Sequence, residues 1–195
     1  MRTSLLSIAA LLAAGSAFAQ VNPLSIIGHA VATAMDVRTK DEVKNDVEIA
    51  ASANKRLLDD KRAEWKGVTL LVFAQHVVLA GAVKTEEAKK IVAEVVHKDD
   101  RIRSLTNDLI VIKNAGDEGS LVKDTALDTK INAELTAAKG VNSVNMRWKS
   151  VNGNVVLMGA ALSKDEAQLA VAKVKGLDGV KSVKSHLRVV PPKKM

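Results

Sequence analysis

The sequence predicts an α+β protein made of two tandem α-β-β-α-β units, each a three-stranded sheet with two helices on one face. The first observation is an internal repeat: residues 77–81 (VVLAG) recur as residues 155–159 (VVLMG), 78 positions later. In each copy, two segments of alternating apolar and polar residues, typical of strands, lie between segments whose apolar residues have helical spacing. A polar, glycine-containing segment at residues 114–120 separates the copies. Two copies are too few for a solenoid and indicate a duplicated small domain.

In the second copy, the first element is a helix with one apolar face. Its apolar residues recur at i, i+4 and i+8, and they are Leu127, Ile131 and Leu135. Asp124 or Asp128 is expected to cap this helix.

A hairpin follows this helix. Asn152 and Gly153 form the dipeptide preferred in two-residue turns, because both central positions need positive φ. Alternating residues on either side predict the two strands. Gly159 ends the return strand, where a glycine accepts positive φ or a close backbone approach.

A second helix and a final strand complete the unit. Ser163 and Glu166 have the spacing of a capping box at the start of that helix. Gly179 and Val180 then lead into residues 183–189, whose odd-numbered positions share one face of a strand.

The first copy repeats this order over residues 41–113. Its charged first helix is expected over residues 42–64, and its hairpin turn at Ala74-Gln75, which lacks the Asn-Gly signal. Gly81 is expected at the strand end that Gly159 occupies in the second copy.

Residues 1–19 (MRTSLLSIAALLAAGSAFA) have the pattern of a secretory signal peptide. Arg2 supplies the positive start, and the apolar run is too short to span a bilayer. Cleavage is expected before Gln20, and because this residue is not cysteine, no lipoprotein anchor is expected. The sequence therefore predicts export to a bacterial periplasm. The predicted organisation is a signal peptide (1–19), an N-terminal segment (20–40), a first unit (41–113), a linker (114–120), a second unit (121–190) and a basic tail (191–195).

Residues 152–159 (NGNVVLMG), 179–183 (GVKSV) and 187–190 (LRVV) resemble the BON-domain family of bacterial envelope proteins. The first copy is degenerate, because Arg101-Ile102 stand where the family has Gly-Val. The resemblance covers about residues 41–190 and is strongest to periplasmic members with two such domains. It implies an α-β-β-α-β fold and non-enzymatic binding of anionic phospholipid. Its structural motif positions are Gly81, Gly153, Gly159, Gly179 and Val180.

The residue content argues against most catalytic chemistry. The absence of cysteine excludes disulfides, thiol nucleophiles and zinc–thiolate sites. None of the four histidines has helical ligand spacing to another, and there is no nucleophile elbow or phosphate loop. Aromatic residues make up 2% of the chain, too few for base-stacking platforms. We therefore predict no enzymatic activity, no metal or other cofactor and no nucleic-acid partner.

The charge of the chain is uneven. Residues 36–113 carry 15 Lys+Arg and 14 Asp+Glu, whereas residues 114–195 carry 13 and 8. Such a basic field attracts anionic surfaces such as lipid headgroups. The candidate lipid-binding residues on the first helix of the second unit are Leu121, Val122, Lys123 and Lys130. The candidates in the later part of this unit are Lys173, Lys181, Lys184 and Arg188.

Each candidate set has a structural alternative. Leu121 and Val122 could pack against the other unit instead of a membrane. Lys184 and Arg188 could face the first unit and pair with acids of its first helix, or they could line a merely solvated strand.

The function predicted is reversible association with anionic phospholipid at the cell envelope, which would support envelope integrity or tolerance of osmotic stress. The alternative is a protein-interaction module that docks an envelope machine or a peptidoglycan-associated partner, for which the apolar residues 24–35 would matter more. A small hydrolase is the least favoured reading.

Overall fold

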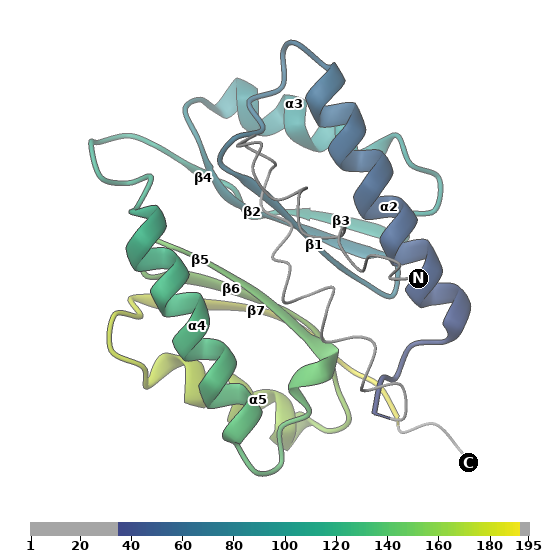
Figure 1. Cartoon of the computed structure of the whole chain (residues 1–195), viewed down its shortest axis with the longest axis vertical. Helices are drawn as coiled ribbons and strands as arrows, with labels where there is room; N and C mark the ends of the chain where they lie inside the picture. The colour runs from purple at the N-terminus through teal and green to yellow at the C-terminus, as the bar shows by residue number, and fades with distance from the viewer. Residues whose placement is uncertain (1–34, 192–195) are drawn as a thin grey trace, which may run out of the picture.

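A computed structural model describes residues 35–191, which form the two expected α-β-β-α-β units (Figure 1). The predicted fold class is confirmed. The predicted signal peptide with its cleavage before Gln20, residues 24–34 and the last four residues lie outside the described residues. The first unit contains α2 (Lys40–Asp59), β1 (Val68–Phe73), β2 (His76–Val83), α3 (Glu86–His97), β3 (Ser104–Asn107) and β4 (Ile110–Val111). The second unit contains α4 (Leu121–Ala137), the 3-10 helix η1 (Ser143–Asn145), β5 (Met146–Val151), β6 (Asn154–Ala161), α5 (Lys164–Lys175) and β7 (Ser182–Val189).

The two sheets lie face to face, and the helices form the outer layers (Figure 1). In each sheet, the central strand pairs antiparallel with the strand before it and parallel with the last strand. β2 and β6 are these central strands. The molecule is therefore a four-layer α-β-β-α sandwich in which each sheet has a helix-covered face and a face toward the other unit.

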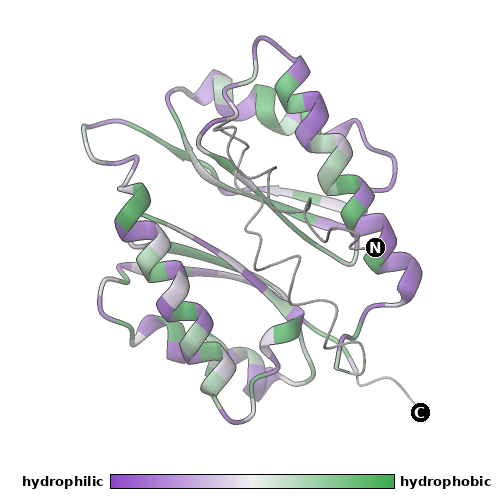
Figure 2. Cartoon of the chain, viewed as in Figure 1, coloured by the Kyte–Doolittle hydropathy of each residue, from purple (hydrophilic) through white to green (hydrophobic). Residues whose placement is uncertain are grey.

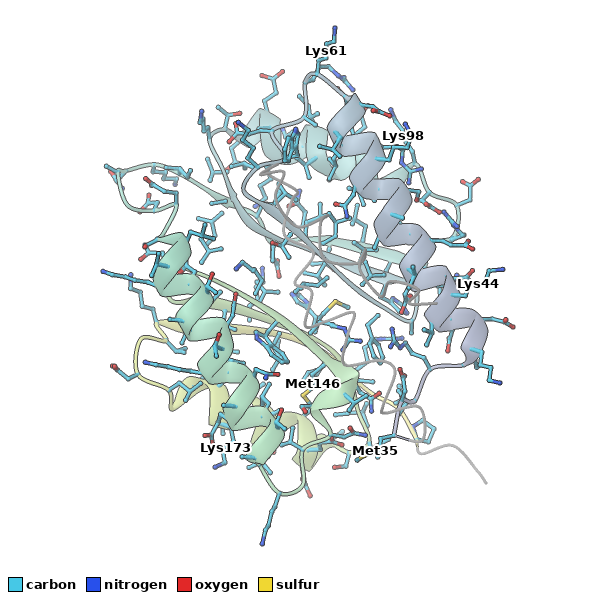
Figure 3. The ribbon with its side chains drawn as sticks, in the orientation of Figure 1. Met35, Lys44, Lys61, Lys98, Met146 and Lys173 are labelled. Atoms are coloured by element: carbon cyan, nitrogen blue, oxygen red, sulfur yellow. The ribbon has the colours of Figure 1, made fainter. Side chains whose placement is uncertain are left out.

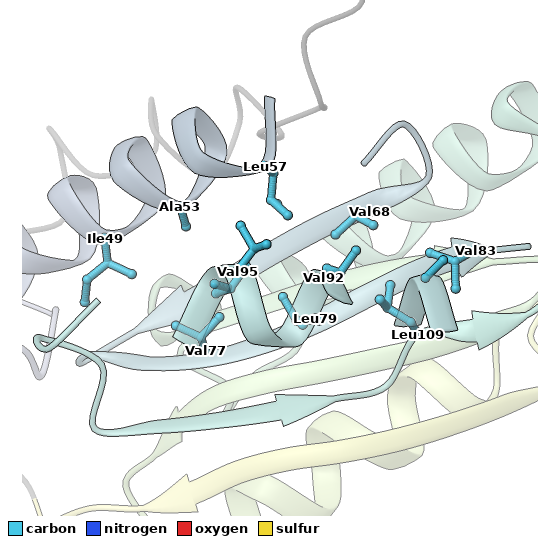
Figure 4. Packing of buried hydrophobic residues seen from close by; sticks show 12 residues of the cluster. Ile49, Ala53, Leu57, Val68, Val77, Leu79, Val83, Val92, Val95 and Leu109 are labelled. Atoms are coloured by element: carbon cyan, nitrogen blue, oxygen red, sulfur yellow. The ribbon is translucent and has the colours of Figure 1, made fainter. Parts of the chain in front are cut away.

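Three apolar clusters hold these layers together. In the first unit, Ile49 and Leu57 of α2 and Val92 of α3 pack onto the sheet (Figure 4). An equivalent core in the second unit includes Ile131 and Leu157. The third cluster lies between the two sheets, where apolar residues line both facing strands (Figure 2). Its buried members are Leu71, Phe73, Ala74, Val78, Ala80, Met158 and Ala160.

α2 ends earlier than the sequence predicts. The Thr39 hydroxyl accepts a hydrogen bond from the Glu42 N–H (3.1 Å), and the Glu42 carboxylate accepts one from the Thr39 N–H (2.9 Å), which completes a capping box. The helix ends at Asp59, and Asp60 takes an extended backbone (φ −82°, ψ 107°). The prediction of a helix to residue 64 was therefore wrong.

The start of α5 uses half of the predicted capping box. The Ser163 hydroxyl accepts a hydrogen bond from the Glu166 N–H (3.0 Å). The Glu166 carboxylate instead accepts from the N–H groups of Leu162 and Asn142, both at 2.7 Å. Glu166 thus joins the loop before η1 to the start of α5.

The last strand of the first unit is broken in two. β3 and β4 both pair with β2, whereas β7 of the second unit runs without interruption along β6. At the break, Leu109 turns into the core and is 2% exposed, and the Asp108 N–H donates to the Leu79 carbonyl (2.9 Å). The break places the side chain of Asp108 in the seam between the units.

Candidate functional site

The first turns of α4 carry an exposed apolar pair. Leu121 and Val122 are 64% and 78% exposed, so the alternative in which they pack against the other unit is wrong. Lys123 and Lys130 are exposed on the same helix. We call the exposed residues of this helix the outer face of α4, and they are Leu121, Val122, Lys123, Thr125, Ala126, Thr129, Lys130, Ala133, Thr136 and Ala137.

Two of the three acids of α4 turn away from this outer face, and the third, Glu134, is partly exposed beside it. Asp124 is buried and accepts a hydrogen bond from the Asn152 N–H (2.9 Å). Asp128 accepts from the Ser150 N–H (2.8 Å) and pairs with Lys149 (2.7 Å). Both lie inside a helix that Ser120 precedes, so the prediction that either one caps it was wrong. Lysine is consequently the only charged residue type on the outer face of α4.

The equivalent helix of the first unit has a different surface. Exposed residues of α2 carry both charges, and Lys44 and Lys55 lie beside Glu48 and Asp59 at 3.9 Å and 2.5 Å. Lys44 points outward from this unit, as does Lys61 (Figure 3). Val47 is 57% exposed among these mixed charges. α2 therefore offers a matched surface of similar exposure without the single-sign charge of α4.

Two further candidate lysines of the second unit have partners. Lys173 on α5 pairs with Glu134 of α4 at 3.0 Å. The Lys181 ammonium donates to the side-chain carbonyl of Asn152 at 2.8 Å, beside the hairpin turn. The structure thus places Lys173 beside α4 and Lys181 beside the hairpin, and neither lysine is part of the outer face of α4.

The basic side of β7 faces the first unit. Lys184 and Arg188 pair in register with Val156 and Ala160 of β6, whose side chains lie in the cluster between the sheets. Neighbouring residues in register point to the same side of a sheet. The alternative that this strand faces the first unit is therefore the one the structure shows.

The acid that meets β7 is not on the first helix. The Asp108 carboxylate, 3% exposed, accepts hydrogen bonds from the Lys184 ammonium and from His186 Nε2 (2.5 Å). The expectation that lysines of this strand would pair with acids of α2 was wrong for Lys184.

Sequence reasoning missed the polar residues that join the units. Besides Asp108, a second contact centres on Phe73, whose ring centroid lies 4.6 Å from Arg38 Cζ and 5.5 Å from Arg147 Cζ. Burial, with a smaller effect of the nearby Arg38, lowers the pKa of Arg147 to about 10. The one available signal was Asp108 itself, an isolated acid in the apolar run LTNDLIV.

Within residues 35–191, no three histidine, aspartate or glutamate side chains gather as metal ligands would. None of the helices in that same span is both long and apolar enough to cross a membrane.

Residues 123–191, from the first turn of α4 to just past β7, match the BON domain family. The second unit is therefore a BON domain. The first unit lies outside this match but has the same order of helices and strands.

Two known proteins are similar over most of the chain. An uncharacterized protein in the gshII 5' region of Anaplasma centrale is 28% identical over 145 residues, which cover 74% of this chain and 95% of that protein. Osmotically-inducible protein Y of Escherichia coli is 27% identical over 182 residues, 90% of this chain and 89% of that protein. The BON domain and this second relative support a non-enzymatic module associated with the cell envelope.

Among solved structures, the chain is similar to the C-terminal domain of CdsD, a structural protein of the Type III secretion system of Chlamydia trachomatis. The TM-score is 0.31 at 19% identity, over 75% of this chain and 67% of that one.

Proposed function

We propose that the protein associates reversibly with anionic phospholipid at the bacterial cell envelope through the outer face of α4. The observation that carries this proposal is the exposure of Leu121 and Val122 beside Lys123 on a face where lysine is the only charged residue type. Periplasmic export, with cleavage before Gln20, is part of the proposal.

The proposed contact has two energetic parts. Apolar side chains at the first turn can enter the boundary between headgroups and acyl chains. Each lysine near an anionic surface adds about 1 kcal/mol, which salt reduces by screening. Lys123 and Lys130 together would then contribute about 2 kcal/mol, which is roughly a 30-fold change in affinity. Binding of this strength is reversible and depends on both lipid charge and salt.

A role under osmotic stress fits this kind of binding. The relative from Escherichia coli is named as osmotically inducible. A module that binds anionic headgroups reversibly can accumulate at the envelope when its synthesis rises. Its binding there would support envelope integrity.

Flotation with phosphatidylglycerol-containing vesicles tests the apolar part of the contact. The substitution Val122→Asp should abolish flotation, because it places a like charge and a polar group in the headgroup layer. Val47→Asp on α2 is the matched control and should leave flotation unchanged, since Val47 is also exposed but lies among mixed charges. Equal loss in both variants would contradict an α4 contact.

The charged part is tested by a pair of double variants. Lys123→Gln with Lys130→Gln should weaken binding about 30-fold and flatten its salt dependence. Lys44→Gln with Lys61→Gln in the first unit should change it much less. The phospholipid proposal is wrong if the wild-type protein floats equally well with neutral phosphatidylcholine vesicles. It is also wrong if the protein floats with neither kind of vesicle. A protein partner in the envelope then becomes the better explanation.

A further inference from the structure

The edge strands β3 and β7 bring polar side chains to one side of the seam between the sheets. Ser104 of β3 pairs in register with His76 of β2, and Arg188 of β7 with Ala160 of β6. His76 lies on the same strand face as Val78, and Ala160 and Val78 both belong to the cluster between the sheets. Ser104, His76 and Arg188 therefore point into the seam from both units.

One end of this seam is closed by an ion pair. Asp108 accepts from Lys184 and His186, and its carboxylate is buried between them. This contact fixes β7 against the end of β3, and Asp108 supplies the counter-charge of Lys184.

The other end of the seam is basic and accessible. The Ser104 hydroxyl and His76 Nδ1 are 2.6 Å apart, and Arg103 pairs with Glu42 at 2.9 Å. Within residues 35–191, the guanidinium of Arg188 has no hydrogen bond or ion pair, although its backbone pairs with β6. The backbone of Arg188 belongs to strand β7, and its guanidinium lies close to other cationic groups.

These groups also influence one another's pKa values. Burial lowers the pKa of Arg188, and the positive charge of Arg103 lowers it further, whereas Glu42 and Asp46 each raise it by a smaller amount. Burial also lowers the pKa of His76, and Arg188 and Arg103 add to this shift. A bound anion would offset the mutual repulsion of Arg103 and Arg188 at this point.

We propose that the basic end of the seam, formed by His76, Arg103, Ser104 and Arg188, binds one phosphate-type oxyanion. A guanidinium matches two oxygens of such a group with two parallel N–H donors. When His76 Nδ1 is protonated it donates to Ser104 Oγ, which frees the serine hydroxyl as a third donor. The oxyanion would give Arg188 the counter-charge that the described residues do not supply.

This site is separate from the proposed lipid-binding face. α4 covers one side of the second sheet, and Arg188 points from the other side. The proposal therefore stands whether or not the outer face of α4 contacts lipid. The same oxyanion could belong to a phospholipid headgroup or to a small phosphorylated compound.

Inorganic phosphate is the probe, added to the full mature chain at constant ionic strength set with chloride. NMR would follow the imidazole of His76 and the backbone amide of Ser104. We expect a saturable shift of both signals and a rise in the titration midpoint of His76, because a bound anion favours the imidazolium. Arg188→Gln should weaken phosphate binding at least tenfold, whereas Lys175→Gln, an exposed control on α5, should not change it.

Vesicle flotation of the same two variants distinguishes the sources. If Arg188→Gln lowers both phosphate binding and flotation with phosphatidylglycerol vesicles, the oxyanion is a headgroup. If only phosphate binding falls, it is a small phosphorylated compound. The proposal is overturned if phosphate gives no saturable shift, or if the shift is the same in wild type and Arg188→Gln. Such a failure leaves the Val122→Asp result unaffected, so the two proposals fail separately.

Discussion

Asp46 and Asp124, 78 positions apart in the chain, each hold the hairpin turn of their own unit from the first helix. The Asp46 carboxylate accepts hydrogen bonds from the N–H groups of Ala74 (2.8 Å) and Gln75 (2.6 Å), and Asp124 accepts one from the Asn152 N–H (2.9 Å). All three turn residues have positive φ. In the first unit the aspartate compensates for the missing Asn-Gly pair.

The two aspartates should nevertheless respond differently to substitution by asparagine. Asp46 also pairs with the buried Arg38 (2.8 Å), so Asp46→Asn should lower the free energy of unfolding by about 2–4 kcal/mol at pH 7. Burial raises the pKa of Asp124, which means that its contribution to stability falls as pH rises above about 4. Asp124→Asn keeps an acceptor oxygen and should change stability by less than about 1 kcal/mol. Urea unfolding of both variants measures this difference, and equal losses would contradict it.

Gly81 and Gly159 occupy the same place in the two units, as the duplication predicts. Their φ angles are 126° and 129°, and a Cβ would lie 1.9 Å and 2.0 Å from the backbone oxygens of Gly67 and Asn145, the residues just before the paired strands. Gly159→Ala should therefore cost about 2–4 kcal/mol in unfolding free energy. Gly176→Ala is the control, because its φ is −76° and its Cβ would be 3.5 Å from the nearest atom, so its stability should stay near wild type.

Asp99 should make the first unit sensitive to acid. Hydrogen bonds from Arg101, and then from Ser52 and Arg56, hold the pKa of this carboxyl well below its usual range. Its stabilising effect is therefore complete above about pH 4 and is lost as pH falls toward the folded-state value. Asp99→Asn should cost about 1.5–3 kcal/mol at pH 7, and the gap to wild type should narrow at pH 3. Asp100→Asn at the exposed neighbouring position should be near neutral at both pH values.

The contact between the units should depend on Asp108 more than on Lys184. Removing the buried carboxylate leaves two donors in the seam unpaired, so Asp108→Ala should cost about 1–3 kcal/mol in thermal or urea unfolding. The side chain of Lys184 is 63% exposed, and Lys184→Gln should cost less than about 1 kcal/mol. A larger loss for Lys184→Gln than for Asp108→Ala would show that the seam is held in another way.

The mature protein should begin at Gln20. Mass spectrometry of protein recovered from a periplasmic extract would show this mass, and a retained Met1 would contradict the export proposal.

The fold could be predicted from the sequence because the spacing of the repeat and the local turn and helix patterns indicate the same elements. Gly81, Gly159 and the Asn152-Gly153 turn act through their own backbone, so a pattern of neighbouring residues reveals them. The roles of Asp124 and Glu166 were predicted less well, because each carboxylate bonds a segment distant in sequence. Asp108 was missed for the same reason, since its partners lie 76 and 78 residues away.

The face-to-face sheets restrict how the duplicated sequence can diverge. Arg101 stands where the second copy has Gly179, but it does not share the positive φ (96°) of that glycine. In this loop the arginine pairs with Asp99 and with Glu48 of α2. The apolar residues between the sheets have no such freedom, since each copy covers the other. Deleting either copy would expose an apolar sheet surface to water and favour aggregation. We therefore expect either copy produced alone to be less stable than the two together.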